Sequence, residues 1–224
     1  MNKILIVGGT KGIGLEISKL LEHKECILTS RSNYLVKNNK HIHYQIDAID
    51  GEYPEIEDLT SIIYCPGTIN LKPFRSLKET DFDNDFNVNV KGAVKVIQHY
   101  QRVLSKADNA SIILFSTVAV TQGMPFHASI ASAKGAIEGL TKSLAAEFAG
   151  KIRVNCIAPT ITNTPLAEGI LRNDEAVKRS DERHPSKRIN NVSDVASTAV
   201  FLLQNNNITG QIINVDGGMS TLKV

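Results

Sequence analysis

The chain has 224 residues, of which 42% are hydrophobic, and its 25 Lys and Arg nearly balance its 23 Asp and Glu. This length and composition are typical of one large globular domain with its own core, and the balanced charge argues against a nucleic-acid-binding protein. The first apolar run is too short for a signal peptide, and no run of eighteen apolar residues occurs, so we expect a cytoplasmic protein without a membrane segment.

The first 21 residues predict a dinucleotide-binding turn. Ile4 to Val7 is a short apolar run typical of a buried strand, and helical spacing continues from Leu15. A glycine turn between a strand and a helix N-terminus binds anions, because the first N–H groups of the helix lack partners and glycine lets a pyrophosphate approach. The alternative is a purely structural turn. The predicted contacts are Gly8, Thr10, Lys11, Gly12, Ile13 and Gly14.

The residues after the second predicted strand, Cys26 to Ser30, indicate which dinucleotide binds. In a dinucleotide fold this position faces the adenosine ribose, where an acidic residue would favour NAD. Here Ser30 and Arg31 occupy it, with Lys11 nearby in the glycine turn, and two cations and a hydroxyl suit a 2′-phosphate. We therefore predict NADP(H) as the cofactor; the alternative is two surface basic residues without a ligand.

The next two connections are short, so the second and third crossovers of the sheet are expected to be truncated. A third strand, His43 to Asp47, ends in an acidic residue that with Ala48 could contact the adenine, or could simply cap a turn. A fourth strand, Ser61 to Cys65, leads into Cys65, Pro66 and Gly67, which we assign to the cofactor site.

The middle of the chain predicts two long helices. Apolar spacing indicates one from Asp81 to about Leu104, and Asn89 within it is unfavourable by propensity, which points to a specific role. A fifth strand, Ser111 to Phe115, and a loop, Val118 to Phe126, follow. The second helix, Ala128 to Ala149, is rich in small residues, so it is either a subunit interface or a buried helix.

The last quarter of the chain completes the alternation of strands and helices. A sixth strand, Ile152 to Ala158, precedes a long polar segment at about 160–190 that could act as a substrate lid. Ser193 and Asp194 are expected to cap a helix through Leu203. A final strand runs from Ile208 to Val215.

This alternation predicts a single Rossmann-type domain over residues 1–224. The fold class is α/β, a three-layer doubly wound parallel sheet of about seven strands. Cys26, Cys65 and Cys156 lie in strand-like apolar surroundings, and their odd number and wide spacing argue against disulfides and against a metal site.

Several separate stretches resemble the short-chain dehydrogenase/reductase family over nearly the whole chain. They are the opening Val7-Gly8-Gly9-Thr10-Lys11-Gly12-Ile13-Gly14, the segment Asn89-Val90-Lys91-Gly92, the small-residue helix with Lys134, the run Ile152 to Pro159, Thr209-Gly210-Gln211, and Val215-Asp216-Gly217-Gly218. The resemblance implies an NADP(H)-dependent oxidoreductase acting on a carbonyl, alcohol or activated alkene, assembled as a homodimer or homotetramer. It also places Pro159, Thr162, Thr164 and Lys134 at the cofactor.

The family's active site contains Asn, Ser, Tyr and Lys, with the Tyr four residues before the Lys. In the family the tyrosine exchanges a proton with the substrate while hydride moves, and the lysine lowers the phenol pKa. Asn89, Thr117 and Lys134 match the Asn, Ser and Lys of this set, but the tyrosine position holds Ile130. Two further departures are Cys65-Pro66-Gly67 in place of Asn-Ala-Gly, and Thr160 in place of the usual Gly.

Isoleucine cannot transfer a proton, which leaves three hypotheses. The chain could be an oxidoreductase with another donor, and His127, one helical turn before Ile130, has suitable chemistry; a loop or interface histidine is the alternative. Hydride transfer could need no protein acid at this place. Lastly, the chain could be a non-catalytic NADP(H)-binding sensor or partner protein. We expect the substrate pocket between residues 118–126 and 164–185, with Met124, Phe126 and Leu166 as apolar contacts.

Overall fold

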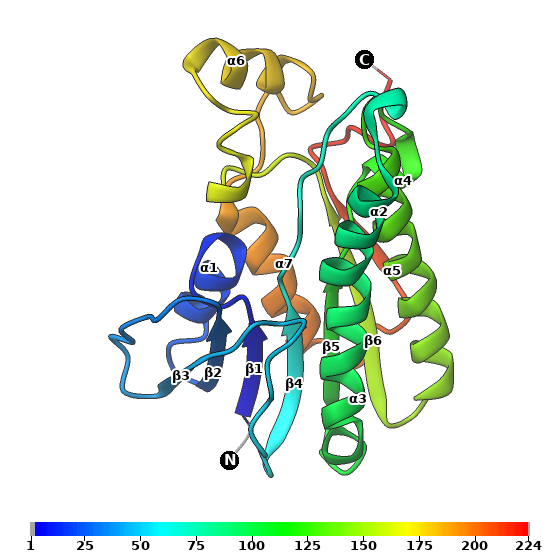
Figure 1. The fold of residues 1–224 in the computed structure, drawn as a ribbon. Coiled ribbons are helices and arrows are strands. Elements are labelled where there is room, and N and C mark those ends of the chain that lie inside the picture. The colour runs from blue at the N-terminus through cyan, green and yellow to red at the C-terminus, as the bar shows by residue number, and fades with distance from the viewer. Residues whose placement is uncertain (1–2, 224) are drawn as a thin grey trace.

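Seven parallel strands form one sheet in the order β3-β2-β1-β4-β5-β6-β7 (Figure 1). The computed structural model describes residues 3–223. The strand order reverses between β1 and β4, and ligands of open α/β sheets bind outside the carboxyl ends of the strands at such a point. The seven-stranded parallel sheet with this strand order confirms the predicted α/β, Rossmann-type fold class. The strands are β1 Lys3–Val7, β2 Glu25–Ser30, β3 His41–Gln45, β4 Leu59–Tyr64, β5 Ala110–Phe115, β6 Ile152–Pro159 and β7 Ile212–Val215.

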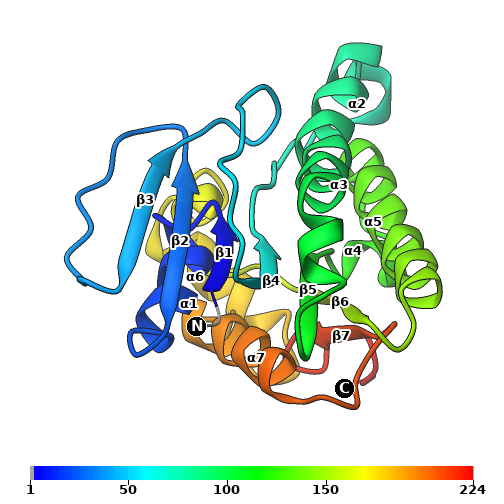
Figure 2. The same ribbon diagram turned by 90° about the horizontal axis from the view of Figure 1, so that it is seen from below.

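Helices cover both faces of the sheet (Figure 2). One face carries α1 (Gly12–Leu20) and α7 (Val192–Gln204), and the other carries α3 (Gly92–Leu104) and α5 (Ala128–Glu147). Helix α6 (Asp174–Glu182) stands away from the sheet, beyond the carboxyl ends of the strands (Figure 1). The remaining helical segments are η1 Phe74–Ser76, α2 Glu79–Phe86, η2 Asn87–Lys91, α4 Ala119–Gln122 and η3 Pro165–Ala167.

Two hydrophobic cores lie on opposite sides of the sheet. Successive side chains of a strand point to opposite faces, so Leu5 and Val7 of β1 pack towards α3 and α5, whereas Ile4 and Ile6 pack towards α1 and α7. All four side chains are buried. A strand buried on both faces must be apolar throughout, which is why the continuous run at the start of the chain correctly predicted β1.

The crossovers on either side of β3 contain no helix, as predicted. The strand itself lies two residues earlier than expected, at His41–Gln45, because it pairs with β2 from Cys26 opposite His41 to Ser30 opposite Gln45. Asp47 therefore follows the strand rather than ending it. Its Oδ1 accepts a hydrogen bond of 2.8 Å from the Ile49 N–H, which is the turn-cap arrangement.

The long helix predicted from Asp81 is present but interrupted. A π-helical turn, η2, separates α2 from α3, and Asn89 lies inside it. The Asn89 side chain donates to the Asp85 carbonyl at 2.7 Å, which occupies an acceptor of the helix backbone. A π turn of this kind often marks a functional site, in agreement with a specific role for Asn89.

Two segments expected to be loops contain helices. The segment 118–126 folds into the single turn α4, and the lid region contains η3 and α6. The polar sequence of α6 gave no apolar stripe to predict it. Its N-cap, Asn173, accepts a hydrogen bond from the Ala176 N–H at 2.9 Å, and this local capping signal marks the start of the helix.

Two boundaries near the end of the chain were predicted wrongly. Helix α7 is capped by Asn191 and Asp194, which form a capping box, and Ser193 lies inside the helix. Strand β7 begins only at Ile212, because Gly210 takes a φ of +71° and Thr209 and Gln211 instead hydrogen-bond to Val154 and Asn155.

The three cysteines are free thiols within the fold. Cys26 and Cys156 are buried and Cys65 is partly buried, and burial raises the pKa of each to about 12. Across residues 3–223, no helix combines the length and apolar character needed to cross a membrane. The same residues include no group of three or more His, Cys, Asp or Glu side chains placed to hold a metal ion.

Candidate active site

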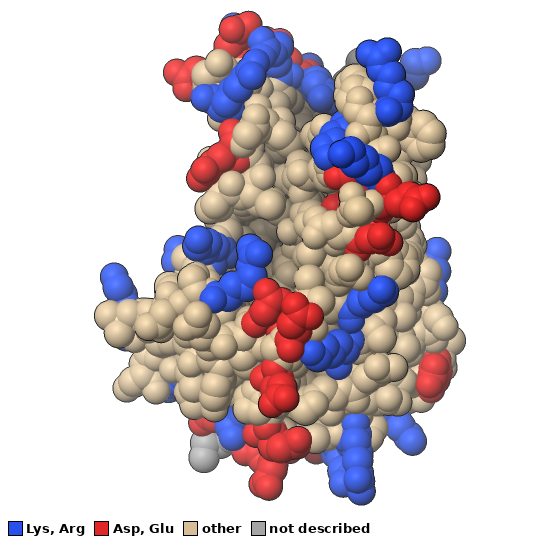
Figure 3. All heavy atoms as spheres, in the orientation of Figure 1, with Lys and Arg blue, Asp and Glu red and all other residues tan. Residues whose placement is uncertain are grey.

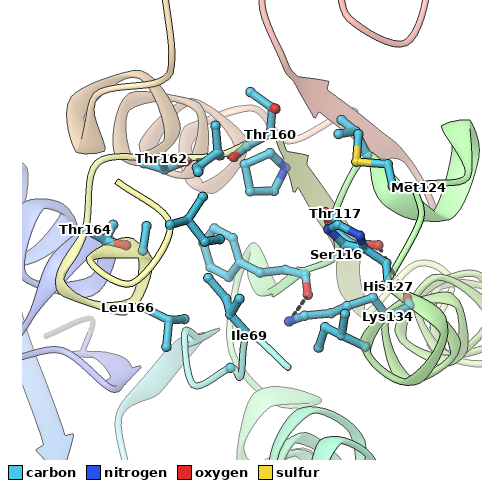
Figure 4. Close-up of a pocket in the computed structure, with 18 of the residues that line it drawn as sticks. Ile69, Ser116, Thr117, Met124, His127, Lys134, Thr160, Thr162, Thr164 and Leu166 are labelled. Carbon is cyan, nitrogen blue, oxygen red and sulfur yellow. Dashed lines mark hydrogen bonds between the residues drawn. The ribbon is translucent and has the colours of Figure 1, made fainter. Parts of the chain in front are cut away.

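A cavity of about 270 Å³ lies at the carboxyl ends of β4, β5 and β6, and residues of the segment 160–184 line one side of it. Figure 3 shows the molecule hollowed between the α6 side and the α2 side, with Lys and Arg side chains on both rims. Figure 4 shows Lys134, Thr117 and His127 on one wall of the cavity and Thr160, Thr162 and Thr164 on another. The cavity is therefore built from segments far apart in the sequence.

The glycine turn at the start of α1 has the geometry of an anion site. Gly8 and Gly12 take φ values of +74° and +50°, and a Cβ on Gly14 would lie 2.4 Å from the Gly8 carbonyl oxygen. The N-cap of α1 is Lys11, whose side chain makes no capping hydrogen bond. The first N–H groups of this helix thus have no side-chain acceptor, which fits a pyrophosphate at this position.

The residues predicted to face the adenosine ribose lie at the end of β2. Arg31 and Lys11 are both exposed, so their charges are available to a ligand. The Ser30 hydroxyl lies 2.8 Å from the Ser32 carbonyl oxygen and 2.8 Å from His43 Nε2. Ser30 is therefore partly engaged within the protein, and the two cations are the freer groups.

Two hydrogen bonds hold the Asn89 side chain, and its amide oxygen has no hydrogen-bond partner among the described residues. Its Nδ2 donates to Thr68 Oγ1 at 3.0 Å and to the Asp85 carbonyl at 2.7 Å, whereas its buried Oδ1 has no partner within the described residues. A Cβ built on Gly67 would lie 3.4 Å from that Oδ1 and 3.5 Å from Lys134 Nζ. A buried amide oxygen without a donor is costly, so this gap suits a bound polar group.

Lys134 is a buried amine at the floor of the cavity. Its Nζ donates to the Phe115 carbonyl at 2.8 Å (Figure 4). Burial lowers the pKa of Lys134 to about 8, against a smaller opposite effect of Cys156, Cys65 and Asp85. Burial keeps both thiols neutral near pH 7, so neither places a negative charge beside the Lys134 amine there.

Thr117, Ile130 and His127 all line the same cavity. Thr117 Oγ1 accepts from the Ala119 N–H at 3.3 Å, which leaves its hydroxyl proton free for a ligand. Ile130 is 5% exposed. His127 is the N-cap of α5, and its Nδ1 lies 2.7 Å from the Pro125 carbonyl oxygen. The lining residues of this cavity include no tyrosine.

The apolar walls agree only in part with the predicted ones. Met124 and Leu166 line the cavity, as expected, together with Ile69 and Leu71 from the segment after β4. Phe126 is 55% exposed and is not among the lining residues, because its backbone takes a φ of +70° before α5 begins.

Sequence reasoning missed a polar pair on the lid side and a buried carboxylate. His184 and Thr160 both line the cavity and both are buried. Asp85 is fully buried and accepts hydrogen bonds from the hydroxyls of Thr68 and Ser129. Thr160 directly follows Pro159 at the end of a strand, so its position in the sequence could have indicated a site hydroxyl. The polar sequence around His184 contains no pattern that would have indicated its burial.

Comparisons with known proteins place this geometry among oxidoreductases. A family model described as enoyl-(acyl carrier protein) reductase matches residues 34–220. The chain is 36% identical over 146 residues to 3-oxoacyl-(acyl-carrier-protein) reductase FabG of Thermotoga maritima, a match covering 64% of this chain and 58% of that protein. It is 31% identical over 241 residues to a tropinone reductase homolog of Datura stramonium, covering 96% and 90%. The solved structure of ElxO with NADP bound matches with a TM-score of 0.84 and 26% identity over 99% of both chains.

Proposed function

The chain belongs to the short-chain dehydrogenase/reductase family, and we propose that it is an NADP(H)-dependent oxidoreductase for a small or medium carbonyl, alcohol or activated alkene. The observation that carries the proposal is that Thr117 and Lys134 line one cavity, and that Asn89 Oδ1 lies beside Gly67, which also lines it. Asn89, Thr117 and Lys134 come from η2, from the segment just after β5 and from α5. Burying a lysine costs free energy, so a protein with no reaction at this place would have little reason to bury Lys134.

The cofactor would extend along the carboxyl edge of the sheet. The N-terminus of α1 would hold the pyrophosphate, and Arg31 with Lys11 would hold a 2′-phosphate. The relative ElxO has been solved with NADP bound, which supports the choice of dinucleotide. The remaining contacts that we propose are Thr10, Ile13, Ser30, Asp47, Ala48, Cys65, Pro66, Gly67, Pro159, Thr162 and Thr164 for the rest of the dinucleotide, and Lys134 for the nicotinamide ribose.

The side chains around the cavity would divide the work of the reaction. The nicotinamide supplies or accepts a hydride when it is bound. Thr117 would donate a hydrogen bond from its hydroxyl to the substrate oxygen, and the Lys134 ammonium would stabilise negative charge developing on that oxygen. Asn89 Oδ1 would hold a water between itself and Lys134, at the gap over Gly67.

The proton cannot come from residue 130. We propose that Ile130 occupies the place of the family's tyrosine, so another group must exchange the substrate proton. His127 is one such group, because its Nδ1 must donate to the Pro125 carbonyl, which leaves Nε2 free to accept a proton. Substrate or water is the other source. The exposed small residues of α5, such as Gly139, would also allow a second copy to pack closely and form a homodimer or homotetramer.

A non-catalytic NADP(H)-binding role is the second candidate, and the isoleucine is the observation that favours it. A tyrosine-to-phenylalanine variant of ElxO has been solved with NADPH bound, so a relative that lacks one tyrosine hydroxyl still binds the cofactor. The two candidates therefore share cofactor binding and differ in turnover.

The deciding experiment follows NADPH oxidation with decanal, cyclohexanone, menadione and cyclohexenone, for the wild type and Ile130→Tyr side by side. Turnover by the wild type supports the oxidoreductase. A silent wild type beside an active Ile130→Tyr would instead favour the binding role, because only the proton donor would have been missing. NADPH fluorescence must first show binding to both proteins, and its absence would contradict both candidates.

A further inference from the structure

Thr160 and His184 form a buried pair at the cavity that the proposed function leaves unused. Thr160 Oγ1 lies 2.9 Å from His184 Nε2, and His184 Nδ1 lies 2.7 Å from the Ser180 carbonyl oxygen. His184 is 1% exposed and Thr160 is 8% exposed. Thr160 follows the end of β6 and His184 follows α6, so the pair joins the sheet to the lid.

The two hydrogen bonds define which nitrogen carries the proton. A carbonyl oxygen can only accept, so His184 Nδ1 is the protonated nitrogen. In the neutral ring Nε2 is then an acceptor, and the Thr160 hydroxyl donates to it. The oxygen of Thr160 keeps its lone pairs for the cavity that this residue lines (Figure 4). A hydroxyl arranged in this way can accept one proton from a ligand while it passes its own to the imidazole.

We propose that Thr160 and His184 form the proton relay of this site, in place of the missing tyrosine. In the oxidative direction, the substrate O–H proton passes to Thr160 Oγ1 while the Thr160 proton passes to His184 Nε2. The substrate C–H bond breaks, its hydride reduces the oxidised nicotinamide dinucleotide, and the C–O bond becomes a carbonyl. The imidazolium afterwards loses its proton to water, and carbonyl reduction is the reverse sequence. This inference rests on the proposed oxidoreductase function.

The helix ends favour His184 over His127 as the carrier of positive charge. His127 is the N-cap of α5, and the positive end of that helix dipole and the Lys134 ammonium both oppose an imidazolium there. His184 instead follows the last turn of α6 and bonds one of its terminal carbonyls, where the dipole is negative. A relay needs a ring that can hold the transferred proton, and this is His184.

The charged groups around His184 support the same choice. Asp216, in the turn after β7, interacts electrostatically with His184. Burial raises the pKa of Asp216, but hydrogen bonds from Ser220 and from the Gly218 N–H outweigh burial and hold that pKa below its usual value. It is therefore ionised near neutral pH and stabilises an imidazolium. Arg183, next to His184 in the chain, is exposed and also lines the cavity. The neighbours from β6 and from the C-terminal turn, Thr160 and Met219, are uncharged.

The same pair could merely fasten the lid to the sheet, so the test needs variants that separate the two roles. His184→Gln can still accept from Thr160 and donate to the Ser180 carbonyl but cannot carry a proton. Thr160→Val removes the hydroxyl at constant shape, and Thr160→Ser restores it. His99→Gln, on the outer part of α3, is the matched control for loss of an imidazole.

We expect kcat to fall by about 10² or more in His184→Gln and in Thr160→Val, since general acid–base groups contribute factors of about 10²–10⁴. Thr160→Ser should recover most of the rate, and His99→Gln should keep it. The affinity for NADPH should change less than threefold in each. His184→Gln keeps both hydrogen bonds, so a fastening role alone would leave its kcat unchanged.

The measurements use the best substrate among decanal, cyclohexanone, menadione and cyclohexenone. Wild-type turnover that persists in both His184→Gln and Thr160→Val overturns the relay but keeps the oxidoreductase. A loss found in His127→Gln but not in His184→Gln assigns the proton to His127 and also overturns the relay. A wild type that binds NADPH but turns over none of the four compounds overturns the proposed function, and the relay with it.

Discussion

Asn89 and Lys134 approach each other across Gly67, where a Cβ would lie 3.4 Å from Asn89 Oδ1 and 3.5 Å from Lys134 Nζ. An acceptor and a donor separated by such a gap are both in reach of one small polar molecule. Glycine keeps the gap open, since any side chain at position 67 would enter it. The gap is therefore formed by Asn89 of η2, Lys134 of α5 and Gly67 of the segment after β4.

Gly67→Ala tests the importance of this gap. The added methyl group would make ordinary contacts, so we expect the free energy of unfolding to change by less than about 1 kcal/mol. The methyl would exclude a polar molecule from between the two groups, and we expect turnover or NADPH affinity to fall about tenfold. Gly169→Ala is the control, because a Cβ there has open space and Gly169 does not line the cavity. Equal activity of the two variants would show that the gap has no role.

The buried amine of Lys134 should make stability depend on pH. Burial lowers its pKa from 10.5 to about 8, so below pH 8 the folded protein bears the full cost of a buried charge. Between pH 8 and 10.5 the unfolded chain binds more protons, so stability rises with pH. We expect the wild type to gain about 3 kcal/mol relative to Lys134→Met over this interval. Urea unfolding of the apo protein at several pH values measures it.

The exposed lysine of α5 provides the comparison for that experiment. Lys142→Met makes the same substitution at an exposed position of the same helix, so it controls for the loss of a lysine as such. A constant difference between Lys134→Met and the wild type across the same pH range would mean that the amine is charged throughout, and that water reaches it.

The parts of the fold that local sequence determines could be predicted. The apolar run of β1 and the glycine turn before α1 are specified by residues next to one another in the chain, and the structure has both. Asn89 was also identified, because an Asn within an apolar helical pattern conflicts with propensity. In the structure the helix is interrupted at this point, and the Asn89 side chain donates a hydrogen bond to the Asp85 carbonyl.

The parts that depend on distant partners could not be predicted. The register of β3 is set by pairing with β2, which moved the strand two residues from its expected place. The contact of Thr160 with His184 joins residues 24 apart, and the helix that lies between them in the chain, α6, has a mostly polar sequence. Asp85 stands in a run of acidic and polar residues that gives no sign of its burial, yet its carboxylate is fully buried and accepts from two hydroxyls.

We predict that residues at the end of β2 set the preference between NADPH and NADH. Arg31→Asp replaces an exposed cation with a carboxylate, which would repel a 2′-phosphate and accept from a 2′-hydroxyl. We expect the ratio of NADPH to NADH affinity, from fluorescence titration, to fall by a factor of ten or more. Lys37→Asp makes the same charge change six residues further along the exposed segment and should leave the ratio nearly constant. An unchanged ratio in Arg31→Asp would contradict the assignment of NADP(H).

The buried carboxylate of Asp85 should be important for stability. It accepts from the hydroxyls of Thr68 and Ser129, and Thr68 in turn accepts from Asn89 Nδ2. Asp85→Ala would leave two buried hydroxyls without their acceptor and create a small cavity, so we expect a loss of about 2–4 kcal/mol in the free energy of unfolding.

Asp85→Asn separates the effect of the charge from that of the hydrogen bonds. Its Oδ1 can still accept from one hydroxyl, so we expect it to lose less stability than Asp85→Ala in urea unfolding at pH 7. Thr68 positions the amide of Asn89, so both variants should also weaken NADPH binding. The variant that displaces the Asn89 side chain more should weaken NADPH binding more. An Asp85→Ala variant as stable as the wild type would mean that the hydroxyls find other acceptors, and that Asn89 is held without this carboxylate.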